Sequence, residues 1–263
     1  MGLFKRRKKK ETPQSKNGPF VSFVLLEDVS LDMDALIKNL SEQWGISIPE
    51  TDIDKEKKSF VSTQEGMIIA ASLMPAPVPN GEAVENAKTN WRWPQAVEVA
   101  EQHKAFLMLT VMGGEQALLD TALLNVKLCA SGLSLKNATG INVLGSVLEP
   151  DFYVETAKIA VREHIFPIMN LVFFGLYSND EGKTGCGYTY GMDAFGKQNI
   201  EIIDSVHGAE EVLAFMTDIA GYVITADVTL QDGETIGFTE EQKLTITQSA
   251  GVAIDEPSLK IGF

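Results

Sequence analysis

Histidine is the side chain best suited to acid–base chemistry near neutral pH, and this chain of 263 residues contains three histidines. His103 and His164 each lie in the last turn of a predicted helix, on a face shared with alanines, where the helix dipole favours an imidazolium. His207 directly precedes another predicted helix. These positions favour structural roles, and we predict no catalytic residue, cofactor or metal ligand. The alternative is a hydrolase whose histidines and carboxylates meet from distant segments.

Two further segments have the residue types of a ligand site but not the required spacing. Gly182-Lys183-Thr184 has the ending of a phosphate-binding loop, but Tyr177 occupies the position of its first glycine and a strand is predicted to follow. The acidic run from Asp227 to Glu241 lacks the alternating ligands of a calcium loop. We expect Asp232-Gly233 within it to form a hairpin turn between strands at 228–230 and 235–238.

Trp91, Arg92 and Trp93 form the best candidate contact with a partner protein. Tryptophan and arginine are over-represented among the residues that dominate binding energies. The three residues follow a proline-rich loop and precede a helix that begins near Pro94. The alternative is that both rings pack on the core. Residues two apart point in different directions on a helix, so we expect Trp93 to be buried and Trp91 to be partly exposed.

Charge is divided unevenly along the chain, whose formal net charge is −14. Residues 1–18 carry seven basic residues and one acidic residue, whereas the rest carries fifteen basic and thirty-five acidic residues. A body this acidic repels phosphates, so we expect no specific nucleic acid partner. The basic tail is predicted to be disordered. Its consecutive cations are candidates for weak contact with an anionic membrane surface: Lys5, Arg6, Arg7, Lys8, Lys9 and Lys10.

The remaining composition, with 44% hydrophobic and 22% charged residues, is typical of a soluble globular protein. The basic start is not followed by the apolar segment of a signal peptide, and no apolar run is long enough to span a bilayer. Cys129 and Cys186 fit no metal-ligand spacing. We therefore expect a cytoplasmic protein, and the sequence does not predict its oligomeric state.

The hydrophobic pattern predicts an α+β fold made of two packed halves, residues 19–145 and 146–263. The first half has the element order of a ferredoxin-like split unit, and the second half repeats these element types loosely. We expect ferredoxin-like-type halves with mostly antiparallel sheets and helices on one face. Ser30 is the predicted cap of the first helix, and Gly45 is its predicted end. The principal predicted strands cover residues 20–26, 59–63, 67–74, 105–112, 139–144, 169–177, 185–190 and 200–203.

The last third of the chain has a distinctive succession of motifs. Gly187-Tyr188-Thr189-Tyr190-Gly191-Met192 leads into Phe195-Gly196-Lys197 and then into an apolar strand at 200–203. Residues 227–238 and the ending Ser258-Leu259-Lys260-Ile261-Gly262-Phe263 follow. This succession resembles the C-terminal domain of the bacterial domain-of-unknown-function 4261 family over about residues 185–263, and more loosely upstream. The resemblance implies no established activity and therefore no functional residues.

These observations predict a non-enzymatic, intracellular bacterial protein that binds a partner protein as an adaptor, a regulator or an immunity-type protein. An acidic surface accelerates the capture of basic partners, which is consistent with such a role. Two alternatives remain at this point. One is a hydrolase with a site assembled from distant His, Asp and Glu residues, and the other is a peripheral membrane protein that acts through its basic tail.

Overall fold

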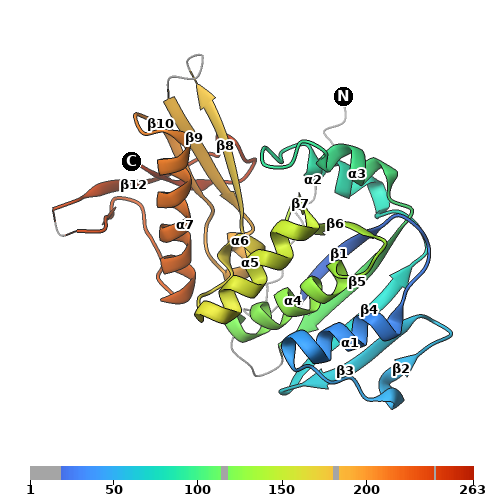
Figure 1. The fold of residues 1–263 in the computed structure, drawn as a ribbon. Helices are drawn as coiled ribbons and strands as arrows, with labels where there is room; N and C mark the ends of the chain where they lie inside the picture. The colour runs from blue at the N-terminus through green and yellow to red at the C-terminus, as the bar shows by residue number, and fades with distance from the viewer. Residues whose placement is uncertain (1–18, 114–117, 180–183, 240) are drawn as a thin grey trace, which may run out of the picture.

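The computed structural model describes residues 19–113, 118–179, 184–239 and 241–263 (Figure 1). The described chain has an α+β fold with two mostly antiparallel sheets, as predicted. The first sheet has the strand order β2-β3-β4-β5-β1-β6-β7, and the second has the order β11-β12-β13-β10-β9-β8. The basic residues 5–10 and Gly182-Lys183 of the phosphate-loop segment lie outside the described residues.

The first sheet is built from residues 20 to 148. Its core strand β1 pairs antiparallel with both β5 and β6, which places Val24 beside Leu107 and Ile141. The strands are β1 (Phe20–Leu26), β2 (Ile53–Asp54), β3 (Ser59–Gln64), β4 (Met67–Met74), β5 (Ala105–Met112), β6 (Ala138–Val143) and β7 (Ser146–Leu148). The helices are α1 (Met33–Trp44), α2 (Glu82–Ala87), α3 (Ala96–Gln102) and α4 (Leu118–Leu133), with short 3-10 turns η1 (Glu50–Asp52) and η2 (Pro79–Gly81).

The strand order of the first sheet differs from the ferredoxin-like prediction. A ferredoxin-like unit would place β1 beside β4, but here β5 lies between them. Helices also cover both faces rather than one. Val24 and Leu26 face the main core, whereas Leu25 faces a smaller core under α2 and α3. Because β1 and β5 are apolar on both faces, each face must be covered, and element order alone does not show which strands pair.

Local signals predicted the C-terminal end of α1 and the turn between β3 and β4. Gly45 has a left-handed φ of 69° and caps the C-terminus of α1. Glu65 and Gly66 both have positive φ, as a tight hairpin turn requires. The predicted N-cap was wrong by two residues. Asp32, not Ser30, accepts a hydrogen bond from the N–H of Ala35.

In the second half, the long helix α7 (Ala209–Thr225) packs along one face of the second sheet (Figure 1). The predicted strand at 169–177 starts later than expected, because a helical turn precedes β8. The hairpin predicted at Asp232-Gly233 is also wrong, because β11 pairs with β12 instead. The elements are α5 (Pro150–Glu163), α6 (Ile168–Leu171), β8 (Phe173–Asn179), β9 (Thr184–Tyr190), η4 (Met192–Phe195), β10 (Ile200–Ser205), α7 (Ala209–Thr225), β11 (Thr235–Ile236), β12 (Leu244–Ser249) and β13 (Ser258–Ile261).

The two halves share a hydrophobic core. Helix α5 packs against α4, and buried residues from both sheets belong to one continuous apolar cluster. The rings of Phe20 on β1 and Phe195 in η4 lie 5.7 Å apart, which ties the start of the first sheet to the second half. The halves are therefore held in a defined relative position by buried apolar contacts.

Candidate functional site

The face of the second sheet opposite α7 carries aromatic and charged side chains. On this face Phe173 is paired with Tyr190, Gly175 with Tyr188, and Tyr188 in turn with Glu201. Directly paired residues of neighbouring strands point to the same side of a sheet, so these side chains share one surface. We call this surface, which also includes Tyr177 on β8, the tyrosine face.

The aromatic rings of the tyrosine face contact one another. The centroid of Tyr188 lies 6.0 Å from that of Phe173 and 6.4 Å from that of Tyr177. A glycine is required under Tyr188, because a Cβ at Gly175 would lie 2.1 Å from the ring atom Cε1. Burial raises the pKa of Tyr188, and burial together with Cys186 raises the pKa of Tyr177 to about 12. Both phenols are therefore neutral at physiological pH.

One end of the tyrosine face opens into a cleft of 320 Å³ between α2 and the second sheet. Its acidic lining residues are Glu85 on α2 and Asp255 and Glu256 on the loop before β13. Its aromatic lining residues include Tyr188 and Tyr190. Burial raises the pKa of Tyr190, and the nearby carboxylates Asp193, Glu256, Asp255 and Glu82 raise it further. The cleft thus combines neutral aromatic rings with a negative potential, a combination that stabilises a cation.

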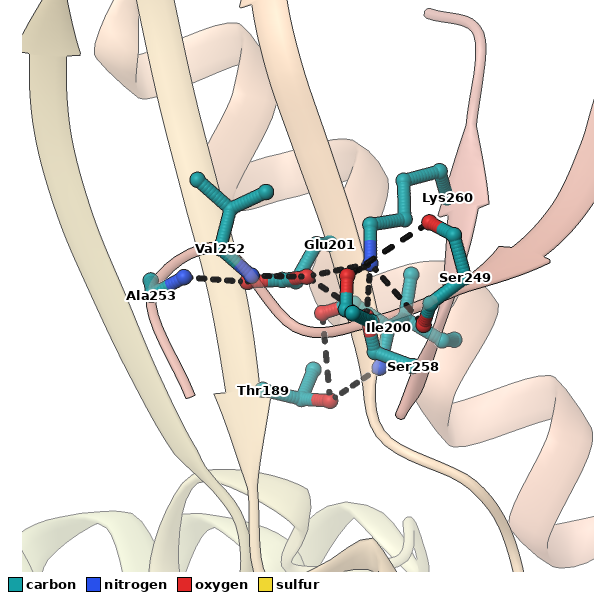
Figure 2. Close-up of polar contacts among 9 residues, drawn as sticks. Thr189, Ile200, Glu201, Ser249, Val252, Ala253, Ser258 and Lys260 are labelled. Carbon is teal, nitrogen blue, oxygen red and sulfur yellow. Dashed lines mark hydrogen bonds and ion pairs between the residues drawn. The ribbon is translucent and has the colours of Figure 1, made fainter. Parts of the chain in front are cut away.

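A buried carboxylate holds the acidic loop in place (Figure 2). Glu201 on β10 is fully buried, and its carboxylate accepts hydrogen bonds from the N–H groups of Val252, at 3.1 Å, and Ala253, at 2.7 Å. Ser258 donates its hydroxyl at 2.5 Å, and the ammonium of Lys260 lies 2.9 Å away. These partners satisfy the charge of the buried carboxylate.

Glu201 therefore positions the wall of the cleft. Burial raises the pKa of its carboxyl group, but the hydrogen bonds from Ser258, Ala253, Lys260 and Val252 outweigh this effect, and the pKa lies below its ordinary value. Lys260 also donates to the carbonyl of Ala250 at 2.5 Å, which fixes the other end of the loop. The carboxylate remains ionised and fully engaged, so its role is to order the loop that carries the cleft's acidic residues.

A second small network fixes the neighbouring strand connection. The hydroxyl of Thr189 on β9 accepts a hydrogen bond from the N–H of Ile200 at 2.8 Å. Asn199 accepts from the N–H of Met192 at 3.3 Å, which holds the start of η4. Thr189 and Asn199 are both buried. The backbone between β9 and β10, on which Tyr190 depends, is therefore held by side-chain hydrogen bonds.

Trp91, Arg92 and Trp93 lie at the junction of the two halves, next to the cleft. Trp91 is 41% exposed, and its indole N–H donates to the carbonyl of Phe174 on β8 at 2.7 Å. The guanidinium carbon of Arg92 lies 4.9 Å from the Trp91 ring centroid and 4.8 Å from that of Phe152 on α5. Trp93 is half-buried against the smaller core. Trp91 is partly exposed as predicted, whereas Trp93 is half-buried rather than buried, and both Trp91 and Arg92 also contact the second half of the same chain.

The three histidines lie on separate elements, and each has its own contacts. The Nε2 atom of His103 accepts from the N–H of Val78 at 2.8 Å, and Nδ1 lies 2.5 Å from the carbonyl of Ala100. Burial lowers the pKa of His103, so the imidazole is neutral. His164 caps α5 in a left-handed conformation, and His207 stacks on Phe263 with centroids 4.3 Å apart. These contacts are structural.

The described residues contain no group of three or more histidine, cysteine or acidic side chains placed to hold a metal ion. Both cysteines are buried and unpaired, and burial raises the pKa of the Cys129 thiol to about 12. Within the same described part of the chain, no helix has the length and apolar character needed to cross a membrane.

Sequence reasoning missed Glu201, Lys260 and the cleft. A signal was present, since Glu201 interrupts the apolar run of β10, and Lys260 interrupts that of β13. Opposite charges inside two apolar strands indicate a buried ion pair if the strands are neighbours. The pairing of β10 with β13, in parallel, supplies that proximity.

The C-terminal region matches a known family. The model of a domain of unknown function (DUF4261) matches residues 188–262, which confirms the resemblance seen in the sequence. The matched region contains Tyr188, Tyr190, Glu201 and the acidic loop, whereas Glu85 on α2 lies outside it. The chain matches no curated protein and no solved structure.

Proposed function

We propose that this protein is a non-enzymatic, cytoplasmic bacterial binding protein whose cleft takes a basic segment of a partner protein. The observation that carries this proposal is the meeting of three carboxylates with Tyr188 and Tyr190 in a single cleft. Lysine and arginine combine an apolar stem with a cationic head. The aromatic rings can pack on the apolar stem and make cation–π contacts with the cationic head, and the carboxylates attract its positive charge.

Two further observations support binding rather than catalysis. The buried carboxylate nearest the cleft, Glu201, uses its oxygens to hold the loop, and His103 uses both ring nitrogens within its own half. The strongly acidic body would also attract a basic partner over a distance, which accelerates association at low salt. An adaptor, regulatory or immunity-type role fits this mode of binding.

The proposal is tested with a fluorescein-labelled octalysine peptide, followed by fluorescence anisotropy and titrated with a full-length chain in which residues 5–10 are glutamine, so that no basic segment of the chain competes with the peptide. The variant Asp255→Asn/Glu256→Gln removes two carboxylates from the cleft, and we expect its affinity to fall about tenfold, consistent with roughly 0.5–1 kcal/mol for each weakened charge contact. The control Glu56→Gln/Glu101→Gln makes the same change of net charge at exposed positions outside the cleft. Equal losses in the two variants would mean that the peptide senses only overall charge.

A second variant tests the aromatic part of the cleft. Tyr190→Leu removes an exposed ring and should weaken octalysine binding about two- to fivefold, the value expected for a cation–π contact of roughly 0.5–1 kcal/mol. Tyr222→Leu is the matched control, because Tyr222 is exposed on α7, outside the cleft. An unchanged affinity of Tyr190→Leu, with an intact far-ultraviolet circular dichroism spectrum, would remove the tyrosine from the site.

A further inference from the structure

We infer that the basic segment of this same chain, residues 5–10, occupies the cleft when no partner is bound and must be displaced by the partner. This inference rests on the proposed function, because it concerns the regulation of the same cleft. Three features favour this segment as the occupant of the cleft: its charge, the position where the described chain begins, and the length of the connecting chain.

The charges of the segment and the cleft are complementary. Residues 5–10 are six consecutive lysines and arginines, and residues 1–18 as a whole carry a net charge of +6. The cleft presents Glu85, Asp255 and Glu256, with Glu82 and Asp193 near Tyr190. Its lining residues include no lysine or arginine, so nothing within it offsets the negative charge. An extended cationic segment is the ligand that such a surface attracts most strongly.

The described chain begins beside the cleft. Strand β1 starts at Phe20, and its antiparallel register with β6 pairs Phe23 with Asn142. Strand β6 ends one residue later, at Val143, and the turn that follows it contains Gly145, which lines the cleft. The ring of Tyr190 packs on the same glycine, since a Cβ there would lie 2.2 Å from the ring atom Cε1. The contact of Phe20 with Phe195, five residues after Tyr190, places the same strand end near the second sheet.

The connecting chain is long enough for the segment to reach the cleft. Nine residues lie between Lys10 and Phe20, and the ten Cα-to-Cα steps that they span extend up to roughly 33 Å. A tethered segment experiences an effective concentration on the order of millimolar. If the free segment bound with a dissociation constant of about 0.1 mM, it would lower the apparent affinity for a competing basic partner about tenfold.

The experiment compares octalysine binding to the full chain and to a chain of the same length in which residues 5–10 are all replaced by glutamine. We expect the glutamine tail to raise the affinity about tenfold, the factor given by the tethered competition. The same tail replacement is then made in the Asp255→Asn/Glu256→Gln background, where the gain should largely disappear. An equal gain in both backgrounds would show a general charge effect and overturn the inference.

A carbodiimide, which joins lysine amines to carboxylates in contact, gives a direct second measurement. We expect cross-linked peptides that join residues 5–10 to Asp255 or Glu256 in the monomer, with isotope-mixed protein excluding links between chains. Links only between chains, or none to these two carboxylates, would overturn the inference. This result is independent of the proposed function, which fails instead if octalysine binds neither the original nor the glutamine-tail chain.

The membrane alternative is an outcome of the same test. Vesicles of phosphatidylcholine and phosphatidylglycerol compete with the cleft for the segment, so we expect Asp255→Asn/Glu256→Gln to bind vesicles several-fold more tightly than the original chain. The Glu56→Gln/Glu101→Gln control should change vesicle binding less. Equal vesicle binding by these two variants, together with no intramolecular cross-link, would assign the segment to a membrane surface and overturn its docking in the cleft.

Discussion

The two faces of the second sheet differ in the side chains that they carry and in how closely these side chains are packed. The face under α7 is apolar and closely packed, with Ile200 and Ile202 on β10 and Phe215, Met216 and Ile219 on α7 all buried. The tyrosine face has a row of aromatic rings, one buried ion pair and a cleft with exposed carboxylates. The same strands supply both faces, because neighbouring residues on a strand point in opposite directions.

The residues of the face under α7 maintain the fold, whereas the exposed residues of the tyrosine face are free to bind a partner. On the α7 face, a substitution should change stability, because the packed core resists any loss of volume. On the tyrosine face, the Glu201 network should have the largest effect on stability, and the exposed residues should affect binding.

Glu201→Ala should cost about 3–5 kcal/mol of unfolding free energy, because it leaves the ammonium of Lys260 partly buried without its partner. It also removes the acceptor for the N–H groups of Val252 and Ala253. Urea unfolding measures the loss. A cost similar to that of an exposed substitution would show that the loop does not depend on this carboxylate.

The pH dependence of stability gives a second measurement at the same residue. The pKa of Glu201 is lowered in the folded protein, so its contribution is complete above the unfolded pKa of about 4.3 and is lost as the pH falls through the lower folded value. The melting temperature of the original chain should therefore fall more steeply with acid below about pH 4.5 than that of Glu201→Gln. Parallel curves for the two proteins would contradict the lowered pKa.

Ile219→Ala should cost about 2–5 kcal/mol, because it opens a cavity between α7 and the sheet. Tyr222→Ala on the exposed side of the same helix is the control and should change stability by less than about 1 kcal/mol. Both variants are compared by urea unfolding. If the two costs were equal, the packing of α7 would not be the main source of stability on this face.

Gly175→Ala and Gly187→Ala place a methyl group on opposite faces of the sheet, and each should cost about 1–3 kcal/mol. At Gly187 the new Cβ would lie 2.6 Å from Met216 Sδ, so only the core should be disturbed. At Gly175 it would meet the Tyr188 ring, which must move within the cleft. We therefore expect octalysine affinity to fall in Gly175→Ala alone, and a loss of affinity in Gly187→Ala would contradict the separation of the faces.

Trp91→Phe should have the smallest effect, about 0.5–1.5 kcal/mol, because it removes the hydrogen bond to the Phe174 carbonyl and keeps most of the ring. Arg92→Met is a companion variant that removes the guanidinium between Trp91 and Phe152. Unfolding in urea measures both costs. If Trp91→Phe instead left stability unchanged and weakened octalysine binding strongly, Trp91 would be a partner contact rather than a link between the halves.

Much of the fold could be predicted because its signals are local. The apolar runs gave most strands of both sheets, and Gly45 and Gly66 marked a helix end and a turn by their need for positive φ. The predicted strand order failed because pairing depends on competition among strands that look alike in sequence. The strand β5, apolar on both faces, takes a central place that the order of elements along the chain does not specify.

The candidate site was predicted less well, because its residues are distant in the sequence. Trp91, Arg92 and Trp93 stood out by their residue types. Of these, Trp91 and Arg92 lie near Phe173 at the edge of the cleft, whereas Trp93 packs on the smaller core. Tyr188 and Tyr190 were visible as part of the family motif, but no local pattern connects them with Glu85 or Glu256. Only the position of α2 across the cleft from the second sheet, and the loop held by Glu201, bring these carboxylates near the tyrosines.

The sequence by itself determined the α+β class, the acidic body, the basic segment at residues 5–10 and the family of the C-terminal region, since each depends on composition or on short-range patterns. Only the tertiary structure decided which strands are neighbours, that Glu201 and Lys260 form a buried pair, and that an acidic, tyrosine-lined cleft lies between the halves. The physical reason is that strand pairing and loop position follow from the combined packing of the whole core, to which residues far apart in the chain contribute together.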